Sequence, residues 1–413
     1  MSVEVTGRRT SRSPLTPLKN VFDQSAPANR QLTLGLAALF VLLAITVLPG
    51  FLTWSFGVDL EIPLRAASRW ASGGQPYLAS SFTETTGPTL PFLYPPWLLP
   101  ILTPIAQLPR TAVLAVWLVL GLAVALWTCR RLSIPWVAIP FVLAWPPFME
   151  GLVTGNVQLW QFAAFAALFY IPGRSWSPQP RDVARPSAKP AASEARAEDG
   201  ADPPTASPNA AATNATPRPA DRHAPVRADV IDGLLAAGVG ALKYTQLLPL
   251  AWLVRPRFRA AVIGGVALAV VIVALLPFTG IGVYRDWFDQ LGRAADPSWS
   301  AAGAPISFIV GRQLSLAAMA AAVAACFFVR GRDAGAWVGI ALIVAAPSVH
   351  GYGFLFLVPA LLTIRRDLAI TLAVVISRYN PYGCWAAIAV AAVALAASNR
   401  FPALRVPPSK EAH

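Results

Sequence analysis

Long apolar runs dominate the chain and alternate with short polar or basic stretches. Many of them approach the roughly 20 residues that a helix needs to cross a bilayer. They are rich in Leu, Ala and Val without alternation of period two, which favours helices over the strands of a membrane barrel. The pattern predicts an all-α polytopic membrane protein, with apolar segments at about 32–55, 92–108, 112–129, 134–149, 156–172, 230–254, 258–278, 311–329, 334–349, 351–364, 367–378 and 383–398.

Two of these segments are not expected to cross the bilayer as straight helices. The run 92–108 contains four prolines, which interrupt helical hydrogen bonding, and is predicted to lie on the outer surface or dip into it as a re-entrant helix. The run 230–254 has Lys243 near its centre and is predicted to break there into two short spans. This arrangement has about 12 spans and places the Arg-rich stretches and both termini in the cytoplasm, so it satisfies the positive-inside rule.

The polar features near the membrane boundaries then collect on the extracytoplasmic side. This convergence indicates one site on that side, although it depends on the topology chosen. The segments are the loop at Asp59, residues 150–158, the break at Lys243, and residues 279–310, 348–353 and 378–383.

The domain organisation follows from the same changes in composition. The first apolar segment is too long for a signal peptide and is expected to stay as an uncleaved span. The segment 173–229 is rich in Pro, Ala, Ser and Thr and is predicted to be a disordered cytoplasmic loop. The chain is thus divided into a basic cytoplasmic tail (1–31), a single transmembrane domain (32–172 and 230–398), this loop, and a second cytoplasmic tail (399–413).

Composition supports a membrane location and argues against nucleic acid as a partner. The 413 residues are 55% hydrophobic and 13% charged, with a net charge of +13; a soluble protein carries about 25% charged residues. The basic residues lie in short clusters between apolar runs, as the positive-inside bias requires. The three cysteines are far apart, so they predict neither a disulfide nor a metal site.

Asp59 is the leading candidate for a catalytic group. It follows the first apolar segment directly, and a carboxylate partly withdrawn from water at the membrane surface can act as a general base toward an acceptor hydroxyl. A solvated charge at a helix end is the alternative. Glu61 is the second candidate for the base or for a substrate-binding group; it would point away from Asp59 if the segment is helical.

Lys243 and His350 are the candidates for contacts with a phosphate. An ammonium between apolar stretches is costly and therefore indicates a functional site, although snorkelling to the interface or an ion pair explains it as well. His350 lies between two apolar runs and could donate a hydrogen bond to a leaving phosphate or orient the base. A histidine that merely satisfies its own polar groups is the competing interpretation.

Further polar and aromatic side chains are expected to bind substrate hydroxyls or stack on a sugar ring. Helix capping and an aromatic belt at the membrane surface are the alternatives for most of them. The chain has no Asp-X-Asp, P-loop, Gly-X-Ser-X-Gly or His-Glu-X-X-His motif, so no metal and no cofactor is predicted. The substrate-binding candidates beside Lys243 and Glu61 are Tyr77, Tyr94, Glu150, Asn156, Gln158 and Tyr352.

The order of these motifs resembles glycosyltransferase family 87, a group with the GT-C fold that includes polyprenol-phosphate-mannose-dependent α-mannosyltransferases. The resemblance covers about 30–400 apart from 173–229, and the order of the motifs is more specific than any one of them. Residues 61–63 and the Pro-Ser-Val-His run depart from the family by lacking an aromatic residue. The motifs are Asp59, Gly-Gln-Pro-Tyr (74–77), Phe-Leu-Tyr-Pro-Pro (92–96), Leu-Pro (108–109), Trp117, Gly-Asn-Val-Gln (155–158), Gly-Ala-Leu-Lys (240–243) and Ala-Pro-Ser-Val-His-Gly-Tyr (346–352).

The resemblance implies an inverting, metal-independent transfer of a sugar, mannose first, from a polyprenyl-phosphate donor to a glycolipid or glycan acceptor outside the plasma membrane. It also implies that Asp59 is the base, that His350 lies beside the donor phosphate, and that Lys243 belongs to the same site. Arabinofuranose is the alternative sugar. A transporter or flippase for lipid-linked sugar is the main rival function, although no internal repeat supports it. A hydrolase or phosphotransferase and a catalytically inactive assembly partner are further alternatives.

Overall fold

The computed structural model describes residues 56–83, 90–134, 136–170, 224–294, 306–331, 333–346 and 349–400. Within these ranges the chain forms α-helices and short 3-10 helices and no strands, which confirms the all-α prediction for this part of the protein. The predicted first span at 32–55 and most of both tails lie outside the described residues.

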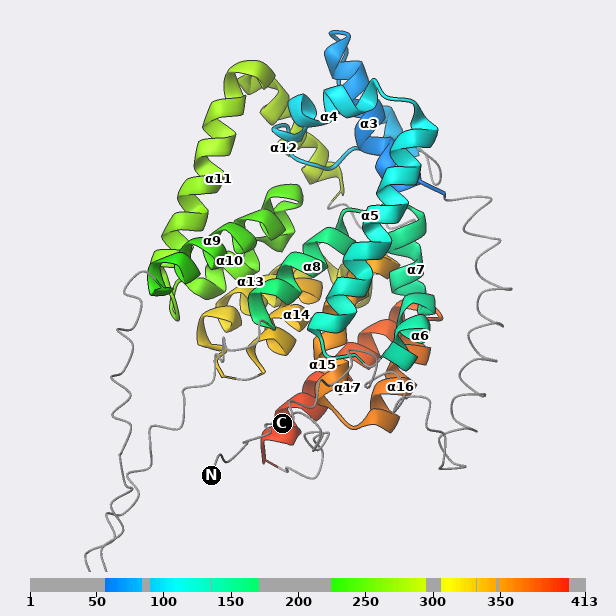
Figure 1. The fold of residues 1–413 in the computed structure, drawn as a ribbon, viewed down its shortest axis with the longest axis vertical. Coiled ribbons are helices and arrows are strands. Elements are labelled where there is room, and N and C mark those ends of the chain that lie inside the picture. The colour runs from blue at the N-terminus through cyan, green and yellow to red at the C-terminus, as the bar shows by residue number, and fades with distance from the viewer. Residues whose placement is uncertain are drawn as a thin grey trace, which may run out of the picture.

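Figure 1 shows the order of the helices along the chain. In the first half of the chain they are α3 (Val58–Ala71), η1 (Ala79–Thr83), α4 (Leu98–Ala106), α5 (Arg110–Arg131), η2 (Trp136–Ala138), α6 (Ile139–Ala144), α7 (Pro146–Val153) and α8 (Gln158–Phe169). In the second half they are α9 (Ala224–Leu242), η3 (Tyr244–Leu247), α10 (Leu248–Leu253), α11 (Phe258–Thr279), α12 (Ile281–Ala294), α13 (Ser307–Phe328), α14 (Ala334–Val344), η5 (Gly351–Leu357), α15 (Val358–Thr363), α16 (Arg366–Ile376) and α17 (Pro381–Arg400).

Three of the described helices are long and apolar enough to cross a membrane: α5, α11 and the stretch Pro381–Ser398 of α17. Many of the other apolar segments form shorter helices because prolines and turns interrupt them. The segment predicted at 134–149 is divided into η2, α6 and α7, with extended backbone at Trp145 before Pro146. The segment predicted at 92–108 forms only the nine residues of α4, so it is no straight span. The total of about 12 spans therefore stays a prediction.

The segment predicted to break at Lys243 does so. Lys243 has extended backbone (φ −150°, ψ 115°) between α9 and η3, and a second short helix, α10, follows. At its other end α9 begins at Ala224, so the loop predicted at 173–229 is too long at its C-terminal end. Residues 224–229 form the beginning of α9, so the helix starts within the predicted loop.

α9 packs closely on α11 through two glycines. A Cβ atom on Gly233 would lie 2.3 Å from the carbonyl oxygen of Ala260, and a Cβ atom on Gly264 would lie 2.4 Å from the carbonyl oxygen of Gly233. Small residues allow two helix backbones to approach in this way. At the same crossing Arg257 forms an ion pair of 2.6 Å with Asp232, whose side chain is fully buried.

An apolar core lies where α3, α4 and α12 come together at one end of the molecule (top of Figure 1). Its buried side chains include Phe92 and Trp287. The Trp287 indole donates a hydrogen bond of 3.1 Å to the carbonyl of Leu93, and the Trp97 indole donates one of 2.9 Å to the carbonyl of Ala241. These contacts tie the region around α4 to the end of α9, close to the break at Lys243.

Candidate active site

The backbone around Asp59 is fixed by the turn that follows α7. The amide of Gly57 donates to the carbonyl of Val153, and the amide of Asp59 donates to the carbonyl of Thr154, both at 2.9 Å. The first turn of α3 is therefore docked on a segment almost 100 residues away. Gly155 permits the close approach because its φ is +77° and a Cβ atom there would lie 2.8 Å from the Cβ of Leu60.

The carboxylate of Asp59 is held by Asn156. The Asn156 side-chain amide donates a hydrogen bond of 3.0 Å to Oδ2 of Asp59. Its own oxygen accepts a bond of 2.8 Å from the backbone amide of Gln158, which fixes which end of the amide faces Asp59. Because Asn156 is only 3% exposed, this geometry is tightly constrained. The bond to Gln158 closes a turn directly before α8, whose N-cap residue is Val157 and not Asn156.

Burial raises the pKa of Asp59, while Thr154, Asn156 and the charge of Lys243 lower it. Asp59 is partly exposed at its surface, so a substrate hydroxyl has access to it. A carboxylate with a raised pKa is a stronger base than one in water, and the three polar neighbours still support its ionised form. This is the combination that a general base needs.

Lys243 and the Tyr94 side chain approach the same carboxylate from other parts of the chain. Lys243 comes from the break after α9, and its positive charge acts on Asp59. Tyr94 comes from the segment before α4 and also interacts electrostatically with Asp59. The structure therefore places these two predicted site residues beside the candidate base. A cation beside the base can bind an anionic group of a substrate close to the carboxylate.

His350 and Tyr352 enter the site at the beginning of η5. Their rings stack at 5.3 Å between centroids with an interplanar angle of 24°. Tyr352 is buried, and its hydroxyl forms a hydrogen bond with Asn156, so it is connected to Asp59 through one residue. His350 is half-buried and is held in place by the stacked ring.

Glu150 lies on α7 close enough to Asp59 for their charges to interact. Tyr379, in the turn between α16 and α17, donates a hydrogen bond of 3.0 Å to Oε2 of Glu150. A Cβ atom on Gly351 would lie within 2.5 Å of both Glu150 Oε2 and the Tyr379 ring, so only glycine fits between them. Tyr379 was not among the predicted site residues, although it lies in the predicted outer segment 378–383.

Gln158 lines the opposite side of the Asn156 turn. It is 4% exposed, and its Oε1 has no hydrogen-bond partner among the residues that the structure describes. This oxygen lies 3.9 Å from where a Cβ atom would stand on Gly353, so it is directed toward η5. A buried acceptor without a partner is costly unless water or a ligand satisfies it.

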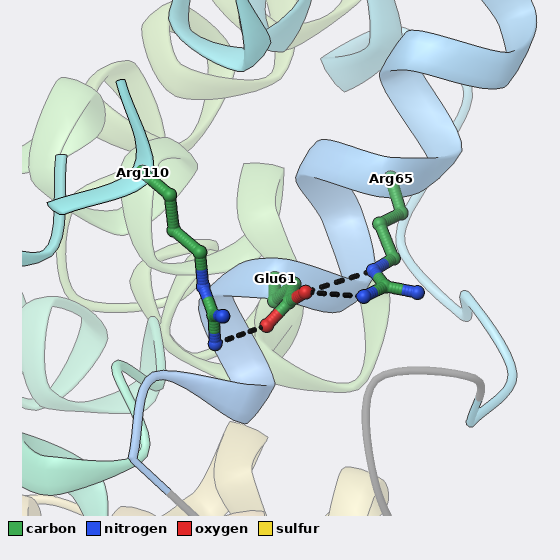
Figure 2. Close-up of polar contacts among 3 residues, drawn as sticks. All are labelled: Glu61, Arg65 and Arg110. Atoms are coloured by element: carbon green, nitrogen blue, oxygen red, sulfur yellow. Dashed lines mark hydrogen bonds and ion pairs between the residues drawn. The ribbon is translucent and has the colours of Figure 1, made fainter. Parts of the chain in front are cut away.

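Glu61 and Tyr77 have partners that explain them without a substrate. Figure 2 shows the carboxylate of Glu61 between two arginines, Arg65 at 2.6 Å and Arg110 at 2.5 Å. This arrangement joins α3 to the start of α5. The hydroxyl of Tyr77 donates a hydrogen bond of 2.7 Å to the carbonyl of Tyr94 and thus positions the backbone of that site residue.

Comparison with known protein families finds a match over part of the chain. The family model described as glycosyltransferase family 87 matches residues 92–185. Over this part of its length the chain resembles glycosyltransferase family 87. The match includes the segment with Tyr94 and the turn with Asn156, whereas Asp59, Lys243 and His350 lie outside it. Searches of curated proteins and of solved structures returned no significant match. The family and the apolar helices together indicate a membrane glycosyltransferase.

Proposed function

We propose that this glycosyltransferase transfers mannose from a polyprenyl-phosphate donor to a glycolipid or glycan acceptor on the extracytoplasmic side of the plasma membrane. The observation that carries the proposal is the meeting of Asp59, Asn156, Lys243 and Tyr352, which come from four separate parts of the chain. Their segments are among those that the charge pattern assigns to the outer side.

The proposed reaction is a single displacement at the anomeric carbon of the donor. An acceptor hydroxyl forms the new glycosidic bond as the bond between that carbon and the phosphate oxygen breaks. Asp59 takes the hydroxyl proton, and the polyprenyl phosphate leaves with the bonding electron pair. Lys243 and His350 stabilise the charge that develops on the phosphate. Attack opposite the leaving group inverts the anomeric configuration, so a β-linked donor gives an α-linked product.

The proposal assigns binding roles to the surrounding polar groups. Asn156 orients the base, and the unpartnered Oε1 of Gln158 accepts a hydrogen bond from a sugar hydroxyl. Tyr352 keeps His350 in place and contributes an aromatic surface next to the sugar. No group of three or more potential ligands that could hold a metal ion occurs among the residues the structure describes, and no step of the proposed mechanism uses one.

The donor is tested with membranes that contain the protein and polyprenyl-phosphate mannose labelled in the sugar. The proposal predicts label in a glycolipid or glycan product and none in membranes without the protein. Polyprenyl-phosphate arabinofuranose serves as the competing donor. Transfer only from the arabinose donor would reassign the sugar, and movement of intact labelled lipid across the membrane without transfer would replace the enzyme by a flippase.

A further inference from the structure

Two acidic side chains of the site lie close together but have different partners. Asp59 receives the amide of Asn156 and the charge of Lys243. Glu150 receives the hydroxyl of Tyr379 and a backbone hydrogen bond from Tyr352. Among the described residues Glu150 takes part in no ion pair, whereas Asp59 has a cation beside it. The two carboxyl groups therefore have unequal support for a negative charge.

Glu61 shows how this protein accommodates a carboxylate that is charged. Two arginines approach its two oxygens at 2.5 and 2.6 Å (Figure 2). The hydrogen-bond partners of Glu150, the Tyr379 hydroxyl and the Tyr352 backbone amide, are neutral instead, and its charged neighbour Asp59 is negative. A carboxyl group that is withdrawn from water and has no cation beside it is more stable in its protonated form than in its ionised form. Two adjacent carboxylates also repel each other, which favours a proton on one of them.

We propose that Glu150 works in its protonated state, as a neutral hydrogen-bond donor to a substrate oxygen beside the ionised Asp59, and that Tyr379 is the residue that positions it. This inference rests on the proposed function for the identity of the substrate oxygen, but not for the protonation state. The two acids, which the sequence predicts to be a base and a substrate-binding group, thus also differ in their protonation state.

The environment of Glu150 supports this assignment from each element packed against it. α3 contributes the negative Asp59, η5 contributes the Tyr352 amide, and the α16–α17 turn contributes Tyr379. Arg378 precedes Tyr379, but its side chain is exposed. Burial, followed by the charge of Asp59, raises the pKa of Glu150 to about 8, while the bonds from Tyr379 and Tyr352 lower it. Glu150 lies on α7, which at eight residues is too short to span a membrane.

Tyr379 is built to hold this carboxyl group in one orientation. Its φ is +49°, a left-handed conformation that is uncommon for a residue with a side chain. Its ring passes over Gly351, where a Cβ atom would meet ring atoms at 2.4 and 2.5 Å. The hydroxyl then reaches Oε2 of Glu150 and holds that oxygen in place. Tyr379 thus acts through Glu150 and is a positioning residue.

Infrared spectroscopy of the purified protein tests the protonation state without any substrate. The inference predicts a carbonyl band of a protonated carboxylic acid at pH 7 that disappears on raising the pH through about 8 and that is missing in Glu150→Gln. In Tyr379→Phe the same band should persist to higher pH, because the lost hydroxyl favoured the ionised form. Tyr382→Phe, a change in the first turn of α17 at a side chain that is 62% exposed, is the matched control, and its acid band should titrate like that of the wild type.

Kinetics with the donor then test the role. In the wild type, kcat/KM should fall as the pH rises through about 8 and Glu150 loses its proton. A glutamine can still donate a hydrogen bond and does not titrate. Glu150→Gln should therefore keep transfer within about 10-fold of wild type and show no such fall at alkaline pH. Tyr379→Phe should lower kcat/KM by about 5- to 10-fold and move that fall to higher pH.

Two results would overturn the inference. One is a wild-type spectrum at pH 7 without any acid band that depends on Glu150. The other is a folded Glu150→Gln protein as inactive as Asp59→Asn, since this would show that Glu150 acts as a carboxylate. If the acid band is present but the wild type transfers no sugar, the protonation state stands and the proposed function is the part that fails.

Discussion

Replacing Asn156 by alanine is the perturbation whose effect the structure defines most closely. The change removes the 3.0 Å bond to Asp59 and leaves the backbone amide of Gln158 without its 2.8 Å acceptor. A hydrogen bond to a charged group contributes about 1.5–3 kcal/mol. If that free energy supports ionised Asp59, its loss raises the pKa of Asp59 by about 1–2 pH units.

The sign of the pH dependence follows from this shift. Asp59 must be ionised to accept a proton, so activity is present above its pKa and lost as the pH falls through it. Asn156→Ala should move this acidic limb of kcat/KM upward by about 1–2 pH units and lower activity at a pH below the wild-type pKa by about 10- to 100-fold. Activity should recover in part at higher pH.

The assay is the pH dependence of sugar transfer in membranes with matched protein amounts. Gln107→Ala, a change at an exposed amide at the end of α4, is the control and should follow the wild-type profile. A uniform loss of activity in Asn156→Ala at every pH, with the acidic limb unmoved, would refute the link between Asn156 and the ionisation of Asp59 and leave only a structural role.

Further predictions follow from charge and from helix packing. Lys243→Met should lower kcat by about 10²- to 10³-fold, because it removes a cation that stabilises the negative charge developing on the phosphate. Steady-state kinetics at saturating donor measure this change. A change in KM alone would contradict a role for Lys243 in the transition state. Gly233→Ala should lower the thermal unfolding midpoint in detergent, since its Cβ atom would collide with the carbonyl of Ala260. Gly238→Ala, where nothing lies within 4 Å, is the matched control and should be neutral or stabilising. Equal midpoints for the two variants would show that α9 and α11 do not depend on this close approach.

The pattern of apolar and polar residues was sufficient to predict the all-helical fold class and the break in the helix at Lys243. A lysine within an apolar run cannot be buried in lipid without great cost, so the interruption is encoded locally. The spacing of two residues on a helix predicted that Asp59 and Glu61 point in different directions, as their separate partners confirm. Helix lengths were predicted less well, because prolines such as Pro146 divide apolar runs that hydropathy alone shows as continuous.

The contacts that complete the site could not be obtained from the sequence. Asn156 and Asp59 are 97 residues apart, and only the docking of α3 on the turn after α7 brings them together. Tyr379 is a still harder case, because its contact with Glu150 depends on a left-handed turn and on the absence of a side chain at Gly351. A tyrosine near a membrane boundary otherwise indicates no more than an interfacial anchor.

The most direct test of the account is single-turnover transfer by Asp59→Asn with labelled polyprenyl-phosphate mannose. Asparagine keeps the shape of the side chain but cannot take the proton from an acceptor hydroxyl. We predict that this variant binds the donor as the wild type does and forms no measurable product. Product formation at the wild-type rate would contradict the assignment of Asp59 as the base on which the proposed mechanism depends.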